Sequence, residues 1–397
     1  MTKPRYQLRG QTSHVSRRCR GRRYLLKPTE TMAQIMEYEV AHAAHKNGVE
    51  IAGVMTMANH FHIQLLDRRA NRSAFMQKLV RALTFRLQPM HGLENSGGLW
   101  KDGQFPDIHK WGVSTELGTL LYIWLNPVAA GLVEKVRDWP GFKVLPEDWG
   151  KEKVVEKPEK YYGRSGPDQV TYTPLPPGCC RDMPLDDLVE MLNRIIGELE
   201  EHFAGVRRRK GASVMGKDAV MKLNPLDSPK TPSKRSYASA RTGFSADSMA
   251  CVEKMEKRYD TFLDSYETQR QKWLLGKTAT FPSGTLKMRT QAPVTCRECP
   301  SDHPGIYVSD QAKAAANGNG EQALEGETQA GRTAQDSESE AAPTVLKATL
   351  GFSGEDWSVQ FTVVDQWPDE KEDSEEYWRR RIDVGRKKDP PVRAASG

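Results

Sequence analysis

The sequence has no long apolar run, and none of its stretches approaches the roughly 20 residues that a membrane-spanning helix needs. Its opening, MTKPRYQLRG, has no apolar stretch behind the first charges, which argues against a secretory signal. No internal repeat is visible either. We therefore expect a cytoplasmic protein without membrane contact, and its 397 residues are enough for two or three domains.

Cysteine is sparse, with six residues scattered over the chain, and this density does not suggest a disulfide scaffold. One pair, Cys296 and Cys299, has the spacing of a metal-binding knuckle. A structural zinc site normally needs four ligands, and neither His303 nor Cys251 supplies a second knuckle. Two free thiols in a loop are the simpler interpretation, and zinc binding at Cys296 and Cys299 stays open.

Positive charge is concentrated near the start of the chain. The formal charge is +6, and residues 1–150 carry 21 Lys and Arg against 13 Asp and Glu. Such a cluster attracts phosphates and makes affinity salt-dependent, although a solvated basic face explains it almost as well. The densest part of the cluster consists of Arg17, Arg18, Arg20, Arg22 and Arg23.

The apolar pattern of residues 1–150 predicts a compact α+β unit. Thr29 or Thr31 can cap the first helix, and Ala58 and Asn59 alone separate two strands, which is hairpin geometry. The last helix should stop at Asn126 and Pro127 because proline disfavours its continuation. Helices are expected over residues 32–47, 74–87 and 114–125, and strands over residues 49–57, 60–66 and a first strand begun near 13–16 and closed at 24–26.

This order of elements predicts a ferredoxin-like antiparallel sheet with helices packed on one face. The rest of the chain is expected to form a mostly helical, partly disordered extension. Helical spacing recurs over residues 185–206 and 248–275. The predicted division is a domain over 1–150, a linker over 151–184, a helical basic accessory region over 185–300, a disordered stretch over 301–345, and a short β-prone segment with a charged tail over 346–397.

Two histidines, His60 and His62, flank Phe61 in the second strand of the predicted hairpin. Residues two apart on a strand point to the same face, roughly 7 Å apart along the chain. Two imidazoles placed in this way can share one divalent cation. The plain alternative is one histidine packed in the core and the other exposed.

A second segment, Tyr122 to Pro127, places a tyrosine and an asparagine four residues apart. Residues four apart on a helix share a face, with about 6 Å between their side-chain bases. Tyr122 and Asn126 should therefore point the same way. Taken alone, this segment is better explained by a buried tyrosine with an asparagine cap before proline.

Four segments together resemble a known family. They are residues 13–18 (SHVSRR), 57–63 (MANHFHI), 98–100 (GLW) and 122–133 (YIWLNPVAAGLV). In order and spacing they resemble the HUH single-tyrosine transposases of insertion sequences and, among these, the REP-associated tyrosine transposases. The resemblance covers roughly residues 5–145. The tyrosine segment is its most specific part, whereas His-apolar-His alone is weak.

The chain departs from the family pattern at two positions, where Ala58 replaces a common proline and Ala129 a common arginine. The first change should only loosen a turn. The second removes a cation near the tyrosine helix and should weaken a phosphate contact. Neither position is among the expected catalytic or metal-binding residues.

The resemblance implies an HUH nuclease fold and a mechanism. Tyr122 would attack a phosphodiester of single-stranded or hairpin DNA, giving a 5′-phosphotyrosine and a free 3′-hydroxyl. His60 and His62 would hold a divalent metal, Mg²⁺ or Mn²⁺, with Asn126 as the third ligand. Ligand softness favours Mn²⁺ at two imidazoles, while the family resemblance allows either.

Physical chemistry supports this mechanism independently of the resemblance. A free phenol is ionised to only about one part in a thousand at neutral pH, and a nearby cation lowers the cost of ionisation. The covalent link then conserves the energy of the broken bond for rejoining.

The five arginines of the basic cluster, with Arg68, Arg69, Arg72, Arg81 and Arg86, would hold the DNA backbone. Trp100, Trp111 and Trp124 are candidates for stacking on bases, with core packing an equal alternative for each.

Other functions remain open from the sequence. A replication initiator or relaxase-type HUH nickase would act on origin-like DNA. A hairpin DNA- or RNA-binding protein that has lost catalysis would form no covalent adduct, and a zinc-ribbon scaffold would contain stoichiometric zinc. The sequence also does not decide between a monomer and a homodimer in which Tyr122 serves the partner's histidines.

Overall fold

The structure is a computed structural model that describes residues 4–94, 98–163, 165–230, 243–286, 288, 290 and 292–298, and two strands over 345–353 and 356–364. The chain separates into two units, residues 1–340 and 341–397. In the second unit, β11 (Val345–Ser353) and β12 (Asp356–Val364) form an antiparallel hairpin within the stretch predicted as β-prone. The stretch predicted as disordered, up to residue 344, lies outside the described residues.

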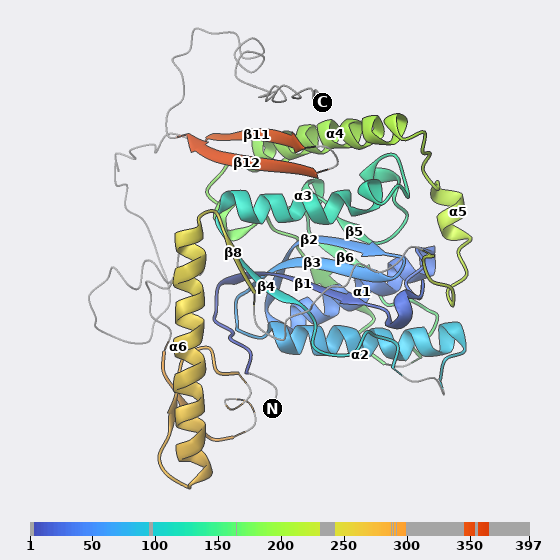
Figure 1. Ribbon diagram of the computed structural model, residues 1–397. Helices are drawn as coiled ribbons and strands as arrows, with labels where there is room; N and C mark the ends of the chain where they lie inside the picture. Colours follow the sequence, from blue (N-terminus) through green and yellow to red (C-terminus); the bar gives the residue numbers. More distant parts are fainter. Residues whose placement is uncertain are drawn as a thin grey trace, which may run out of the picture. The chain divides into compact units, whose positions relative to one another are not determined.

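A six-stranded mixed sheet forms the centre of the first unit (Figure 1). Its order is β5-β2-β3-β1-β4-β8, and all neighbours are antiparallel except β4 and β8. With its helices, the unit is α+β, as the sequence predicts. The strands are β1 (Gln11–Arg18), β2 (Val49–Met57), β3 (His60–Asp67), β4 (Asp107–Trp111), β5 (Lys143–Val144) and β8 (Gly243–Ala246).

The predicted hairpin of β2 and β3 is confirmed. A turn of two residues, Ala58 and Asn59, joins the strands, and Met57 pairs with His60. On its other edge β3 pairs with β1, where Ser16 lies opposite His62. The first strand ends at Arg18 rather than returning at residues 24–26, which follow a short 3-10 turn, η1 (Arg20–Arg22).

Helices α1 (Glu30–Asn47) and α2 (Arg72–His91) lie side by side on one face of the sheet (Figure 1). The Thr29 side chain caps α1 by accepting a hydrogen bond from the Met32 amide at 3.2 Å. The helix ends before Gly48, whose φ of +62° suits a residue without a Cβ. Apolar side chains of β3, such as Phe61 and Ile63, are fully buried between the sheet and these helices.

Helix α3 (Val113–Ala129) packs on the opposite face of the sheet. Gly53 of β2 permits this packing, because a Cβ there would lie 2.4 Å from a methyl carbon of Leu120 and 3.2 Å from the Trp124 indole nitrogen. The prediction that helices pack on one face therefore holds for α1 and α2 and is wrong for α3. The sequence pattern missed it because α3 is apolar enough to be buried on most of its surface.

The prediction that this helix stops at Asn126 and Pro127 is also wrong. The helix continues to Ala129, and the Ala130 amide still donates to the Asn126 carbonyl at 3.0 Å. Proline costs most in a helix interior, and here less than one turn follows it. Asn126 is consequently held by the helix on the same face as Tyr122.

Residues 151–184, predicted as a linker, instead contain a second hairpin. It consists of β6 (Lys153–Glu156) and β7 (Gln169–Tyr172), and it packs against α1. Its buried residues Val155, Tyr162 and Tyr172 belong to the same apolar core as the sheet. The abundance of Lys, Glu, Pro and Gly hid this short alternating pattern.

The described part of the accessory region contains three helices and, besides β8, two short strands. These elements are α4 (Leu185–Arg209), α5 (Lys217–Met221), α6 (Met249–Leu274), β9 (Thr280–Phe281) and β10 (Thr295–Cys296). Three further short 3-10 turns lie earlier in the chain, namely η2 (Val136–Asp138), η3 (Pro146–Asp148) and η4 (Gly178–Cys180). Tyr259 and Phe262 of α6 pack against Tyr6 at the start of the chain. Among the described residues, no helix has the length and apolar character that crossing a membrane requires.

Candidate active site

The imidazoles of His60 and His62 lie side by side on the face of β3 that α3 covers. Their ring centroids are 4.8 Å apart and their planes are nearly perpendicular, at 84°. Phe61 between them points to the opposite face and is fully buried. The strand therefore separates the two side chains with polar chemistry from the apolar core, as the spacing predicts.

Hydrogen bonding fixes the protonation of the His60 ring. Its Nδ1 lies 2.6 Å from the Asn59 side-chain oxygen, which can only accept. Nδ1 of His60 therefore donates, and in the neutral ring Nε2 carries the free lone pair. The turn residue Asn59 thus sets which nitrogen of His60 is available to a ligand.

A third histidine, His14 on β1, completes the cluster and was missed as a site residue by the sequence interpretation. His14 Nε2 lies 2.9 Å from His62 Nδ1, and the ring centroids are 5.1 Å apart. The other nitrogen of His62, Nε2, is buried and has no hydrogen-bond partner among the residues that the structure describes. His14 belongs to the first of the four family-like segments, but only the β1–β3 register shows that it meets His62.

All three imidazoles are neutral at pH 7. Burial, assisted by the nearby charge of Arg18, lowers the pKa of His62 to about 4. Burial and the neighbouring His62 bring the pKa values of His14 and His60 well below the usual range. Neutral imidazoles keep a lone pair, which is the form that can bind a cation.

Tyr122 stands on α3 directly opposite the cluster. Its ring centroid lies 5.7 Å from that of His62 and 6.3 Å from that of His14, both edge to face. Half of the tyrosine, 50%, is exposed to solvent, although the helix around it is mostly buried. A large ligand can therefore approach the phenol while the imidazoles flank its inner side.

Asn126 lies one helical turn beyond Tyr122 and is half-buried, and its side chain makes no hydrogen bond within the described residues. No group of three or more His, Cys, Asp or Glu side chains poised for a metal exists in that part of the chain. A cation here would thus rely on two imidazoles and an amide oxygen. The neutral rings and the unpartnered Nε2 of His62 fit that demand.

Segments far along the chain hold α3 in place. Asp247, just after β8, caps its N-terminus by accepting from the amides of Ser114 and Thr115 at 3.2 and 2.7 Å. In its last turn, Arg207 of α4 donates to the Val128 carbonyl at 3.2 Å. The Trp124 indole donates to the Val144 carbonyl at 2.7 Å. Together these bonds fix the helix that carries Tyr122.

The basic cluster lies at the end of β1, next to the histidines. Arg18 is exposed and lies opposite His60 in the sheet. Arg17 donates to the Gly103 carbonyl at 3.0 Å, and Arg20 pairs with Asp102 at 3.2 Å, so both contact the loop that follows α2. The Arg23 Nε donates to the Arg20 carbonyl, and the partly exposed Arg22 adopts a left-handed backbone.

Some residues expected to contact DNA are buried instead. Trp100 is only 7% exposed, its ring packs edge-on against Phe61, and its indole donates to Thr84 at 2.9 Å. Trp124 is also buried, so neither tryptophan is free to stack on a base. Arg72 is fully buried and bonds Asp107 at 3.0 Å, which is a structural role. Trp100 and Trp124 are packed in the core, as the alternative interpretation of the tryptophans has it.

Zinc binding at Cys296 and Cys299 stays a hypothesis, because the structure describes one of the two cysteines. Cys296 is half-buried in β10 and packs on the apolar cluster of α6. Cys299 lies outside the described residues.

Comparisons with known proteins give two similar solved structures. One is a REP-associated tyrosine transposase bound to a REP hairpin, with 22% identity and a TM-score of 0.31, covering 36% of this chain and 82% of that chain. The other is a predicted transposase from Deinococcus radiodurans R1, with 18% identity and a TM-score of 0.24, covering 32% of this chain and 96% of that chain. No protein-family model matches the chain, and no curated protein matches it.

Proposed function

We propose that the chain is a single-tyrosine transposase-like nuclease that cuts and rejoins single-stranded or hairpin DNA through Tyr122. One observation carries the proposal. A half-exposed phenol lies 5.7 Å, ring to ring, from a buried neutral imidazole whose Nε2 has no hydrogen-bond partner among the described residues. Edge-to-face packing would stabilise a structural tyrosine as well. The half-exposed phenol beside neutral imidazoles is in addition the arrangement that a nucleophile attacking a phosphate needs.

In the proposed reaction, the Tyr122 oxygen attacks the phosphorus of the scissile phosphodiester. The new P–O bond to tyrosine forms as the bond to the 3′ oxygen breaks, and the 3′ oxygen takes up a proton while the phenol loses one. The products are a 5′-phosphotyrosine and a free 3′-hydroxyl. Attack of a 3′-hydroxyl on the phosphotyrosine reverses the exchange and rejoins DNA without ATP.

Three side chains would hold a divalent cation, namely His60, His62 and Asn126. Such a cation supplies Lewis-acid stabilisation of charge on the phosphate. For His62 to offer the lone pair of Nε2, its Nδ1 must carry the proton and donate to His14 Nε2. His14 is thereby a positioning residue that fixes the tautomer and orientation of the ring facing Tyr122.

We assign the core of the first unit to the ferredoxin-like arrangement. The segment β1-α1-β2-β3-α2-β4 gives the spatial strand order β2-β3-β1-β4, all antiparallel, with both helices on one face. The histidines and α3 lie on the face left open by this core. Phenol and imidazoles meet within a single chain, so the site we propose does not need a homodimer.

DNA would reach the site over the exposed end of β1. We expect Arg18, Arg22 and Arg23 of the basic cluster to contact phosphates, Arg18 above all because it is exposed at the end of β1. Arg17 and Arg20 contact the loop beyond α2. A flexible single strand can bend around the exposed end of β1 toward Tyr122.

The test is formation of a covalent protein–DNA adduct. We expect wild-type protein to give one with hairpin DNA that has single-stranded flanks, in Mn²⁺ or Mg²⁺, and Tyr122→Phe to give none while still binding. Equal binding by both without any adduct would identify a hairpin-binding protein without catalysis. An adduct formed only with origin-like DNA would favour a replication-type nickase.

A further inference from the structure

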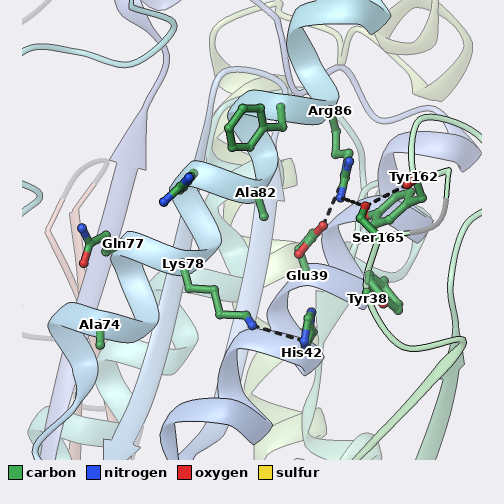
Figure 2. Close-up of a pocket in the computed structure, with 13 residues that line it drawn as sticks. Tyr38, Glu39, His42, Ala74, Gln77, Lys78, Ala82, Arg86, Tyr162 and Ser165 are labelled. Atoms are coloured by element: carbon green, nitrogen blue, oxygen red, sulfur yellow. Dashed lines mark hydrogen bonds and ion pairs between the residues drawn. The ribbon is translucent and has the colours of Figure 1, made fainter.

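A cavity of about 450 Å³ lies between α1 and α2, on the face of the sheet opposite Tyr122. We call it the α1–α2 pocket, and the residues that matter for its chemistry are Tyr38, His42, Lys78, Arg81, Phe85 and Tyr162. Its volume falls in the range of small-ligand pockets. Figure 2 shows that α2 forms one wall, α1 the facing wall, and the β6–β7 connection around Tyr162 and Ser165 one end.

One ion pair in the pocket is already satisfied. Arg86 pairs with the buried Glu39 at 3.5 Å and donates to the Ser165 hydroxyl at 3.1 Å (Figure 2). It also donates to the Tyr161 carbonyl at 2.8 Å, and its guanidinium carbon lies 3.9 Å from the centroid of the Tyr162 ring. This network closes the end of the pocket and neutralises its carboxylate. Arg86 is therefore part of the wall rather than a free cation.

Two other cations have no carboxylate partner within the described residues. The Lys78 Nζ donates to His42 Nε2 at 3.2 Å, and Arg81 lies over the Phe85 ring at 5.5 Å. Burial, and the charge of Lys78, lower the pKa of His42 to about 4, so this histidine accepts the bond without adding charge. The pocket as a whole carries an excess of positive charge and is suited to an anion.

An exposed aromatic ring lies beside Arg81 and lines the same pocket as Lys78. Phe85 is 55% exposed and stands four residues after Arg81, on the same stripe of α2. Ala74 and Ala82 leave space along the neighbouring stripe, where a longer side chain would fill the cavity. Cations next to an accessible aromatic face are the arrangement that binds a phosphate together with a stacked base.

We propose that the α1–α2 pocket binds a nucleotide, with its phosphate held by Lys78 and Arg81 and its base stacked on Phe85. That this nucleotide belongs to a DNA strand rests on the proposed function. A strand with one nucleotide docked there would be anchored on the face of the sheet away from the catalytic site. A free nucleotide offers the same chemistry, and the test separates the two sources.

The experiment measures binding by the full chain carrying Tyr122→Phe, so that no cleavage takes part. The probe is a fluorescein-labelled hexathymidylate, followed by fluorescence anisotropy at several salt concentrations. The pocket variant is Lys78→Ala with Arg81→Ala, and the matched control is Lys254→Ala with Lys257→Ala, two exposed lysines of α6. We expect about tenfold weaker binding and a salt slope reduced by about one for the pocket variant, against less than twofold for the control.

Phe85→Ala should weaken binding about fivefold or more without changing the salt slope, because it removes stacking and no charge. A hexamer with 5-iodouracil should crosslink, under ultraviolet light, to a peptide of α2. Competition by thymidine monophosphate as effective as by the hexamer would assign the pocket to a free nucleotide. Competition by inorganic phosphate as strong as by the nucleotide, or a pocket variant that behaves as the control, would overturn the proposal.

These outcomes are independent of the reaction at Tyr122. Pocket-dependent binding without a covalent adduct would leave the pocket in place and reject the proposed function. If wild-type protein forms an adduct and the pocket variant binds as tightly as the control, the proposed function stands and the pocket proposal is rejected. Thermal unfolding of each variant checks that a lost signal is not lost folding.

Discussion

His14 Nε2 and His62 Nδ1 lie 2.9 Å apart on neighbouring strands, and His62 Nε2 is buried without a hydrogen-bond partner in the described part of the chain. The ring centroid of Tyr122 lies 5.7 Å from that of His62. A residue of β1 therefore engages one nitrogen of the β3 imidazole and leaves the other available to a ligand. In the proposed site, His14 would support the ring from the sheet.

Replacement of His14 by alanine should weaken metal-dependent activity without removing any expected ligand. Partners that orient a metal-binding histidine typically contribute about 10- to 100-fold in metal affinity. We therefore expect the Mn²⁺ concentration for half-maximal adduct formation to rise by about that factor, and Mn²⁺ binding measured by calorimetry to weaken in parallel. His45→Ala, at an exposed position of α1, is the control and should change neither value. An unchanged Mn²⁺ affinity in His14→Ala would mean that the hydrogen bond has no positioning role.

Stability should fall as the pH is lowered from about 6.5 to about 4 in a buffer with a chelator. Burial lowers the pKa of His62 to about 4, against 6.5 for a free imidazole. The unfolded chain therefore binds a proton in this window that the folded chain does not, and folding loses on the order of 3 kcal/mol toward the acidic end. Chemical unfolding at a series of pH values measures the loss, which should be shallower for His62→Gln. Identical slopes would show that His62 is not held neutral by the fold.

Gly53→Ala should destabilise the protein and reduce activity, because the added Cβ would lie 2.4 Å from a Leu120 methyl carbon and must push α3 away from the sheet. Overpacking of this kind costs about 1–3 kcal/mol, visible as a lower midpoint of urea unfolding. Gly118→Ala on α3 is the control, because nothing lies within 4 Å of its added Cβ. That change should be neutral or stabilising. Equal effects at both positions would contradict the close packing of α3.

Local pattern was enough to predict which side chains of the candidate site share a face. The alternation of His60, Phe61 and His62 specifies which side chains share a face, and the spacing of Tyr122 and Asn126 does so on a helix. Both depend only on the backbone period. The two-residue turn before His60 and the Thr29 cap are equally local, and each is seen in the structure.

What the sequence did not predict depends on contacts between distant segments. His14 meets His62 through the register of β1 and β3, and Asp247 caps α3 from far along the chain. The burial of Trp100 depends on a loop that pairs with Cys19. Composition also led to the wrong prediction of a linker over residues 151–184, because charged residues there outnumber the few apolar ones that enter the core.

The most direct test of the account is the identity of the residue that becomes linked to DNA. Wild-type protein is incubated with hairpin DNA and Mn²⁺, digested with trypsin and nuclease, and analysed by mass spectrometry. We predict a nucleotide adduct on the peptide of residues 111–135, at Tyr122, the single tyrosine of that peptide. Cleaved DNA with no protein-bound nucleotide, or an adduct on any other residue, would contradict the assignment of Tyr122 as the nucleophile.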